Sequence, residues 1–228
     1  VFVSERTTFA MPETGIGLFP DVGGGWYLPR LPGRVGEYMA LTGARLDAAD
    51  CLYLGLATHY VEQTSLEELH ERILKAPSRL QGSLGSIAAT PPEAKIEANL
   101  ASITRLFASD RLEEVLKALE EDESEWAQAE LATLRSKSPL SCKVSLRLLA
   151  EGANRASFEE EMRAEYALAG RVVRTHDFRE GVRALLIDKD NSPQWDPPAP
   201  EQVDDEMLDI LFAALPPSEQ WNPFPESK

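Results

Sequence analysis

Hydrophobic positions follow two patterns along this chain, and the change between them falls near residue 64. Before it, short apolar runs such as "VFV" (1–3) and "TTFAM" (7–11) alternate with stretches rich in Gly and Pro, which is typical of short strands and turns. The stretch "RVGEYMALTG" predicts a helix that Gly43 ends, and "DAADCLYLGLATHYV" (47–61) predicts a second helix and a short strand. Residues 1–63 therefore predict an α/β arrangement.

After residue 64 the apolar residues recur at three- and four-residue spacing, which predicts a mainly helical region. It begins with "SLEE" (65–68), in which Ser65 and Glu68 predict a capping box. The prolines and glycines between 77 and 95 predict an irregular connector. Amphipathic helices are expected again over 96–137, where the acidic run "EEDESE" is interpreted as a solvated face.

The last third of the chain predicts three well-marked helices and a loose end. "SPLSCKVSLRLLAEG" predicts a helix from about Ser141 to Gly152. The stretches "SFEE" (157–160) and "DFRE" (177–180) predict capping boxes for the two helices that follow. A proline-rich stretch interrupts the pattern, and the tail 207–228 predicts one short helix followed by an unstructured end.

Composition is that of a folded protein with a strong acidic balance. The 228 residues are 43% hydrophobic and 27% charged, and the net charge is −15. Such a charge repels polyanions and argues against nucleic-acid binding and against binding to anionic membranes. An anionic ligand would need a local cation. Arg30 and Lys189 are the candidates, with a structural role favoured for Arg30 and a solvated one for Lys189.

Two cysteines, Cys51 and Cys142, stand far apart and outside any CxxC pattern, so neither a zinc site nor a disulfide framework is expected. They are interpreted as small core side chains in a reducing compartment.

No apolar run reaches the roughly 18 to 20 residues of a membrane span, and the first residues do not resemble a signal peptide. We therefore expect a cytoplasmic protein. Because Val1 stands within a strand-like run, we also expect an upstream segment.

Glycines and histidines give no evidence for a phosphate or metal site. Gly23–Gly25 lack the spacing of a phosphate-binding loop and are not followed by Lys-Ser or Lys-Thr. They predict a tight turn or a close approach of the backbone to another element. His59, His70 and His176 have no second histidine at ligand spacing.

Two carboxylates, Glu13 and Asp21, stand in an apolar and glycine-rich stretch, where an unpaired acid is costly or raises its pKa. The intervening glycines and prolines let the chain fold back, so both acids can line one pocket. Two carboxylates in a shared apolar pocket suit proton transfer or covalent acyl chemistry near neutral pH. The residues alone leave a second interpretation open, in which Asp21 is a helix N-cap and Glu13 is a buried, salt-bridged acid.

The stretch "FAMPETGIGLFPDVGGGWYLPRLPG" (9–33) resembles the central motif of the crotonase (enoyl-CoA hydratase/isomerase) superfamily, most closely in its 3-hydroxyisobutyryl-CoA hydrolase branch. The stretch "YMALTGARLDAADCLYLGLATHYV" continues the resemblance. Later, "SPLSCKVSLRLLAEG" and "HDFREGVRALLIDKDNSPQW" are similar to the C-terminal segments of that branch. The resemblance spans the whole chain but only the C-terminal half to two-thirds of a family member.

The resemblance implies the fold class α/β, with part of the crotonase ββα spiral core at 1–63 and a mainly helical C-terminal region at 64–228. It implies hydrolysis of 3-hydroxyisobutyryl-CoA to the free acid and coenzyme A in valine degradation. Glu13 would act as a nucleophile or as the base that activates water, and Asp21 would bind the 3-hydroxyl and assist proton transfer. No cofactor or metal is expected, because coenzyme A is part of the substrate.

Family members carry, upstream of this motif, the coenzyme A nucleotide site and the two amides of the oxyanion hole, which we expect in a missing N-terminal half. Asp21 departs from general hydratases, which typically have glycine there. Four alternatives stay open: an enoyl-CoA hydratase, a dienoyl-CoA isomerase, a non-catalytic acyl-CoA-binding relative, and an interaction module built from the helical region. A homo-oligomer is also left open.

Overall fold

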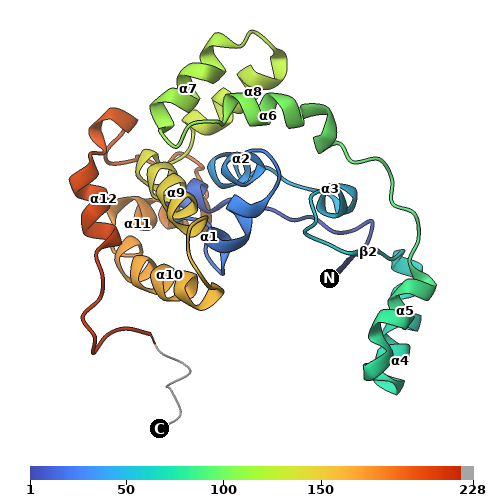
Figure 1. The fold of residues 1–228 in the computed structure, drawn as a ribbon. Coiled ribbons are helices and arrows are strands. Elements are labelled where there is room, and N and C mark those ends of the chain that lie inside the picture. Colours follow the sequence, from blue (N-terminus) through green and yellow to red (C-terminus); the bar gives the residue numbers. More distant parts are fainter. Residues whose placement is uncertain (222–228) are drawn as a thin grey trace. The chain divides into compact units, whose positions relative to one another are not determined.

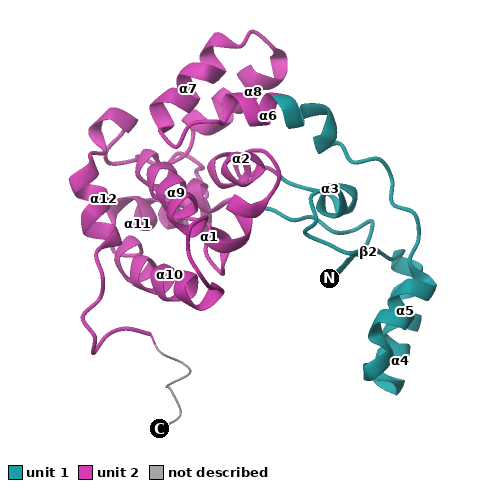
Figure 2. Ribbon diagram, in the orientation of Figure 1, with its two compact units in different colours: residues 1–10, 45–101 teal, residues 11–44, 102–228 magenta. Residues whose placement is uncertain are grey.

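The computed structural model describes residues 1–221, and the predicted unstructured end lies partly outside them. The chain divides into two compact units (Figure 2). The first comprises residues 1–10 and 45–101, and the second comprises residues 11–44 and the chain from 102 onward. These units cut across the division expected at residues 63 and 64. The boundary at residues 63 and 64 is the expected end of the crotonase spiral core, and it stays a prediction.

The first unit contains short strands and helices (Figure 1). In chain order they are β1 (Phe2–Val3), α3 (Ala48–Tyr53), β2 (His59–Tyr60), η3 (Gln63–Ser65), α4 (Leu66–Lys75), η4 (Pro77–Arg79), α5 (Leu80–Ile87) and η5 (Ile96–Asn99). β1 and β2 pair in parallel, with Phe2 opposite His59. The predicted strand at 7–11 is reduced to one antiparallel bridge between Phe9 and Leu46.

Two expectations for this unit are wrong. The connector predicted at 77–95 contains the helix α5, because Leu84 and Ile87 pack on a small core with Val61 and Leu69. This apolar burial outweighs the low helix propensity of the glycines in α5. Ser65 makes no capping hydrogen bond from its side chain, since the 3-10 turn η3 already leads into α4.

The second unit is helical. Its elements are η1 (Glu13–Ile16), α1 (Gly24–Tyr27), η2 (Leu28–Arg30), α2 (Val35–Thr42), α6 (Leu100–Leu106), α7 (Leu112–Glu121), α8 (Glu125–Arg135), α9 (Pro139–Gly152), α10 (Phe158–Val172), α11 (His176–Val182), the π-helix η6 (Arg183–Ile187), η7 (Pro200–Gln202) and α12 (Asp205–Phe212). α6 begins two residues before the unit boundary. A core formed by α9, α10 and α12 buries Phe19, so it anchors the segment between the two acids.

Helix ends agree with the sequence in part. Gly43 ends α2 in the left-handed conformation, as predicted. Ser157 caps α10 by accepting the amide of Glu160, although the Glu160 carboxylate accepts from Ala156 rather than from Ser157. α9 begins earlier than predicted, with Ser138 as its cap.

The capping box predicted from Asp177 and Glu180 is wrong, because Thr175 caps α11. Asp177 is fully buried and accepts hydrogen bonds from Ser138 and from the amide of Asp196. The sequence correctly predicted a helix with a polar N-cap here, but the cap is Thr175, two residues before the predicted Asp177. Within residues 1–221, no helix has the length and apolar composition of a membrane span.

Candidate active site

Glu13 opens the 3-10 turn η1, which packs closely within the second unit. The amides of Gly17 and Leu18 both donate to the carbonyl oxygen of Glu13. Gly17 has a φ of 76°, and a Cβ there would lie 2.2 Å from the carbonyl oxygen of Asp177 in α11. Glycine is therefore required for this turn to pack against α11. The backbone that carries Glu13 is fixed by this contact.

The carboxylate of Glu13 is partly withdrawn from solvent and incompletely paired. Its Oε2 atom is buried and has no hydrogen-bond partner within residues 1–221. Burial raises the pKa of Glu13 to about 7, and the charge of Asp21 raises it further, while a hydrogen bond from its own amide opposes both effects. A carboxyl with this pKa exchanges its proton near neutral pH, as a general base or acid must.

Asp21 lies in the turn before α1. The N-cap of α1 is Gly23, with a φ of 88°, and Asp21 contributes only its carbonyl oxygen, which accepts from Gly24. Glu13 forms no salt bridge with a residue of the described chain. The interpretation of the two acids as a helix cap and a salt-bridged core residue is therefore wrong. The charge of Asp21 contributes to the raised pKa of Glu13, and a single pocket that holds both acids stays a prediction.

Two further groups share this neighbourhood. The pKa of Tyr27 is raised to about 12, first by burial and then by the charges of Glu13, Glu165 and Asp21. The pKa of Glu165 is raised to about 7, again mainly by burial, with Asp21 contributing. The charge of Asp21 thus contributes to the raised pKa values of Glu13, Tyr27 and Glu165.

Glu165 comes from α10 and reaches the glycine turn. Its Oε2 accepts from the amide of Gly23 at 2.8 Å, and its Oε1 accepts from the amide of Gly25 at 3.2 Å. A Cβ on Gly25 would lie 1.9 Å from Oε1 of Glu161. The prediction that these glycines form a tight turn with close backbone approach is confirmed.

Glu165 is not among the predicted site residues, although the spacing of apolar residues in α10 held a signal for it. Glu161 and Glu165 share the spacing of the buried residues Leu168 and Val172, at i, i+4, i+7 and i+11. All four side chains are at most 3% exposed. Two acids on the apolar stripe of a helix indicate buried carboxylates with specific partners.

Neither candidate cation, Arg30 or Lys189, contributes to the raised pKa values of Glu13, Tyr27 and Glu165. Arg30 stacks on the ring of Trp26 at 3.5 Å and donates to the carbonyl oxygen of Gly152 at 3.1 Å, which agrees with the structural role expected for it. Lys189 is exposed, with a φ of 57°, in the loop after η6. Its coenzyme A contact stays a prediction.

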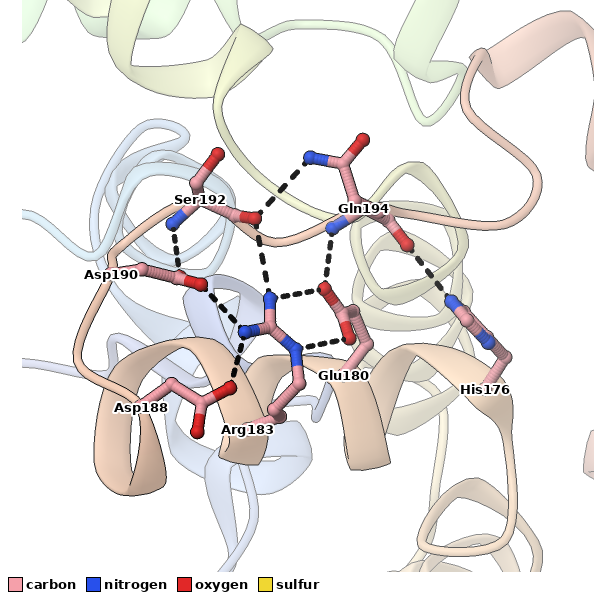
Figure 3. A network of polar contacts seen from close by, with 7 residues as sticks. All are labelled: His176, Glu180, Arg183, Asp188, Asp190, Ser192 and Gln194. Carbon is pink, nitrogen blue, oxygen red and sulfur yellow. Dashed lines mark hydrogen bonds and ion pairs between the residues drawn. The ribbon is translucent and has the colours of Figure 1, made fainter.

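The loop that carries Lys189 is organised by one arginine. Figure 3 shows Arg183 binding Glu180, Asp188 and Asp190, with nitrogen–oxygen distances of 2.6 to 2.8 Å. Three carboxylates therefore neutralise this cation, and it offers no free charge to an anionic ligand. The network fixes the loop rather than forming a second candidate site.

Metal-ligating and thiol chemistry find no support in the described chain. Residues 1–221 contain no group of three or more His, Cys, Asp or Glu side chains arranged to hold a metal ion. Cys51 and Cys142 are buried and free, and burial raises their pKa values to about 11 and about 12. These thiols stay protonated, as expected of small core side chains.

Comparison with known proteins gives long matches. The enoyl-CoA hydratase/isomerase family matches residues 1–212. The chain is 44% identical to "3-hydroxyisobutyryl-CoA hydrolase, mitochondrial" of Gallus gallus and 41% identical to the protein of that name in Homo sapiens. Each match covers 93% of this chain and 57% of the relative. The chain thus spans little more than half the length of these relatives.

Solved structures show the same fold. A carnitinyl-CoA dehydratase from Mycobacterium thermoresistibile superposes with a TM-score of 0.88 at 30% identity, covering 95% of this chain and 62% of the other. An enoyl-CoA hydratase from Rhodobacter sphaeroides superposes with a TM-score of 0.84 at 36% identity, covering 94% and 61%. The expected fold, part of a crotonase core with a helical C-terminal region, is confirmed. The names of the curated relatives say mitochondrial, and a cytoplasmic location for this chain stays a prediction.

Proposed function

Because the chain belongs to the enoyl-CoA hydratase/isomerase family, we propose that it supplies the acid pair of an acyl-CoA thioester hydrolase. The proposed substrate is 3-hydroxyisobutyryl-CoA, and the products are the free hydroxy acid and coenzyme A, in valine degradation. Identities of about 40% to hydrolases of that name support this substrate. No cofactor beyond the coenzyme A of the substrate is proposed.

The observation that carries the proposal is the state of Glu13. Its Oε2 is buried without a hydrogen-bond partner in the described chain, and its pKa lies near 7. A carboxylate whose solvation has been removed without replacement by an ion pair is available to attack or to take a proton. Asp21, close enough to shift that pKa, is then the group proposed to bind the 3-hydroxyl.

Two routes use these groups. In the first, the Glu13 carboxylate attacks the thioester carbonyl, the carbon–sulfur bond breaks, and coenzyme A leaves as the thiolate, which takes up a proton. Water then cleaves the mixed anhydride and returns Glu13 as a carboxylate. In the second, Glu13 takes a proton from water as that water attacks the same carbonyl, and the proton passes to the departing sulfur.

A second candidate is the hydration of an enoyl-CoA or the reverse dehydration. It is favoured by the two solved structures, of a carnitinyl-CoA dehydratase and an enoyl-CoA hydratase. The same Glu13 would then exchange a proton with water at a carbon–carbon double bond, and the thioester would stay intact. A dienoyl-CoA isomerase and a non-catalytic acyl-CoA-binding protein remain further alternatives.

The test uses this chain joined to the upstream segment that its relatives carry, called here the completed chain. Release of coenzyme A from 3-hydroxyisobutyryl-CoA is followed with a thiol reagent, and hydration of a short enoyl-CoA by loss of its conjugated absorbance. We expect coenzyme A release from the completed chain. Enoyl-CoA hydration without thiol release would favour the second candidate, and neither reaction would favour a binding protein.

The 228-residue chain alone is the matched comparison. If the oxyanion hole lies in the upstream segment, the chain alone should be at least about 100-fold slower, because each missing oxyanion donor lowers the rate roughly 100- to 1000-fold. An ordinary enzymatic rate from the chain alone would contradict that placement.

A further inference from the structure

The turn that follows Asp21 has an unfavourable backbone. Val22 has a φ of 50° and is 71% exposed, and Gly23 follows with a φ of 88°. Glycine adopts this left-handed conformation freely, but a β-branched residue in it is strained by about 1–3 kcal/mol. Val22 is too exposed for its own packing to compensate. Contacts from elsewhere in the unit must hold the turn.

Glu165 makes those contacts from the buried face of α10. Its two carboxylate oxygens accept from the amides of Gly23 and Gly25. These glycines follow the strained Val22 in sequence, whereas Asp21 precedes it. The Glu165 side chain is 3% exposed, so water does not compete for these bonds. A carboxylate bonded by two backbone amides fixes the position of that backbone more strongly than a neutral acceptor would.

Stability alone does not explain a carboxylate at this position. Burial and the neighbouring acids raise the pKa of Glu165 to about 7, so its ionised form destabilises the fold. An acid kept in a buried place at this cost is typical of a functional site.

We propose that Glu165 is a positioning residue, which holds the strained turn at Val22–Gly25 and thereby places Asp21 opposite Glu13. The inference rests on the proposed function for its kinetic consequences but not for its structural ones. Several ionisable groups interact electrostatically with Glu165: Asp21 and Tyr27 from the turn and α1, and Glu161 from its own helix, which is paired with Arg155 at 2.6 Å.

The kinetic test is Glu165→Gln in the completed chain. Glutamine keeps the size of the side chain but offers one acceptor oxygen, and its amide group opposes the second backbone donor. We expect kcat to fall roughly 10- to 100-fold, as displacement of a reacting group by about 1 Å does, with KM changed less than about twofold. Wild-type kcat in Glu165→Gln would overturn the proposal.

Glu37→Gln is the matched control. Glu37 is also buried in the second unit, at 6% exposure, and pairs with Arg34 at 3.1 Å, but the acids of the candidate site do not contribute to its pKa shift. This variant loses a buried carboxylate without touching the turn. It should keep kcat within about threefold of wild type. Equal losses of kcat in both variants would indicate general destabilisation and contradict a positioning role.

A measurement independent of activity uses nuclear magnetic resonance on the 228-residue chain. The amide protons of Gly23 and Gly25 should shift together as the pH rises through about 7, because ionisation of Glu165 strengthens both hydrogen bonds. The shifts should vanish in Glu165→Gln and persist in Glu37→Gln. Wild-type amides without this titration would overturn the proposal. If the completed chain released no coenzyme A, the proposed function would fail while this titration still decided the role of Glu165.

Discussion

Glu13 and Asp21 differ in what surrounds each carboxylate, so their substitutions should have different effects. Glu13 has an unpartnered buried oxygen, whereas Asp21 lies in the turn whose Gly23 amide donates to Glu165. Glu13→Gln in the completed chain should lower kcat about 100- to 10,000-fold with little change in substrate binding, because it removes a group that acts in the transition state. Steady-state kinetics with substrate dissociation constants tests this. Full turnover would exclude Glu13 as nucleophile or base.

Asp21→Asn should change substrate preference as well as rate. A site built to bind a substrate hydroxyl discriminates against an analogue that lacks it, because its polar group is then left unpaired. A hydrogen bond to a charged group contributes about 1.5–3 kcal/mol, so the preference for 3-hydroxyacyl over unsubstituted acyl thioesters should fall about tenfold or more. The measurement is kcat/KM for both thioesters. An unchanged ratio would assign the hydroxyl to another residue.

At the scale of elements, α1 packs closely against α9 and α10 because Gly25 has no side chain at the contact. A Cβ on Gly25 would lie 1.9 Å from Oε1 of Glu161 and 2.9 Å from Cγ of Leu148. Gly25→Ala should therefore lower the free energy of unfolding by about 1–3 kcal/mol, as overpacking does. Urea unfolding of the 228-residue chain measures it.

Gly170→Ala is the internal comparison for that experiment. Gly170 lies in α10, is exposed, and has nothing within 4 Å of an added Cβ. Alanine there should raise the free energy of unfolding by about 0.5–1 kcal/mol through helix propensity. Two changes of the same chemistry should thus act in opposite directions. If both variants had the same sign, the close packing of α1 would not be the cause.

At the scale of the whole molecule, the buried acids make stability depend on pH. Glu13 and Glu165 each have a pKa near 7 in the folded chain against an ordinary value of 4.5, so between those values the folded state binds more protons than the unfolded state. The free energy of unfolding should therefore fall as the pH rises from about 4.5 through 7, as far as these groups contribute.

Glu13→Gln isolates one of these contributions. The variant should gain stability relative to wild type on going from pH 5 to pH 8, by on the order of 1 kcal/mol, less than the full pKa shift would give because solvent reaches part of the side chain. Urea unfolding of both proteins at the two pH values provides the difference, in which other titrating groups cancel. A difference that does not change with pH would show that Glu13 has an ordinary pKa in the folded chain.

The sequence by itself determined the helix that ends at Gly43 and the cap at Ser157. These features depend on local chemistry: a left-handed glycine and a hydroxyl before a helix. The motif around Glu13 and Asp21 also led to the family, which the long match over residues 1–212 shows. The predicted capping box at Asp177 was wrong because this residue accepts a buried hydrogen bond from Ser138, which is distant in sequence.

Only the tertiary structure decided what surrounds the two acids. Glu165 meets the amides of Gly23 and Gly25 across some 140 positions of sequence, and α5 forms because Leu84 finds Val61 and Leu69. The raised pKa of Glu13 likewise follows from burial in the packed unit, which no short stretch of sequence specifies. Hydrogen bonds and desolvation act between atoms that are close in space, and packing, rather than spacing along the chain, sets which atoms those are.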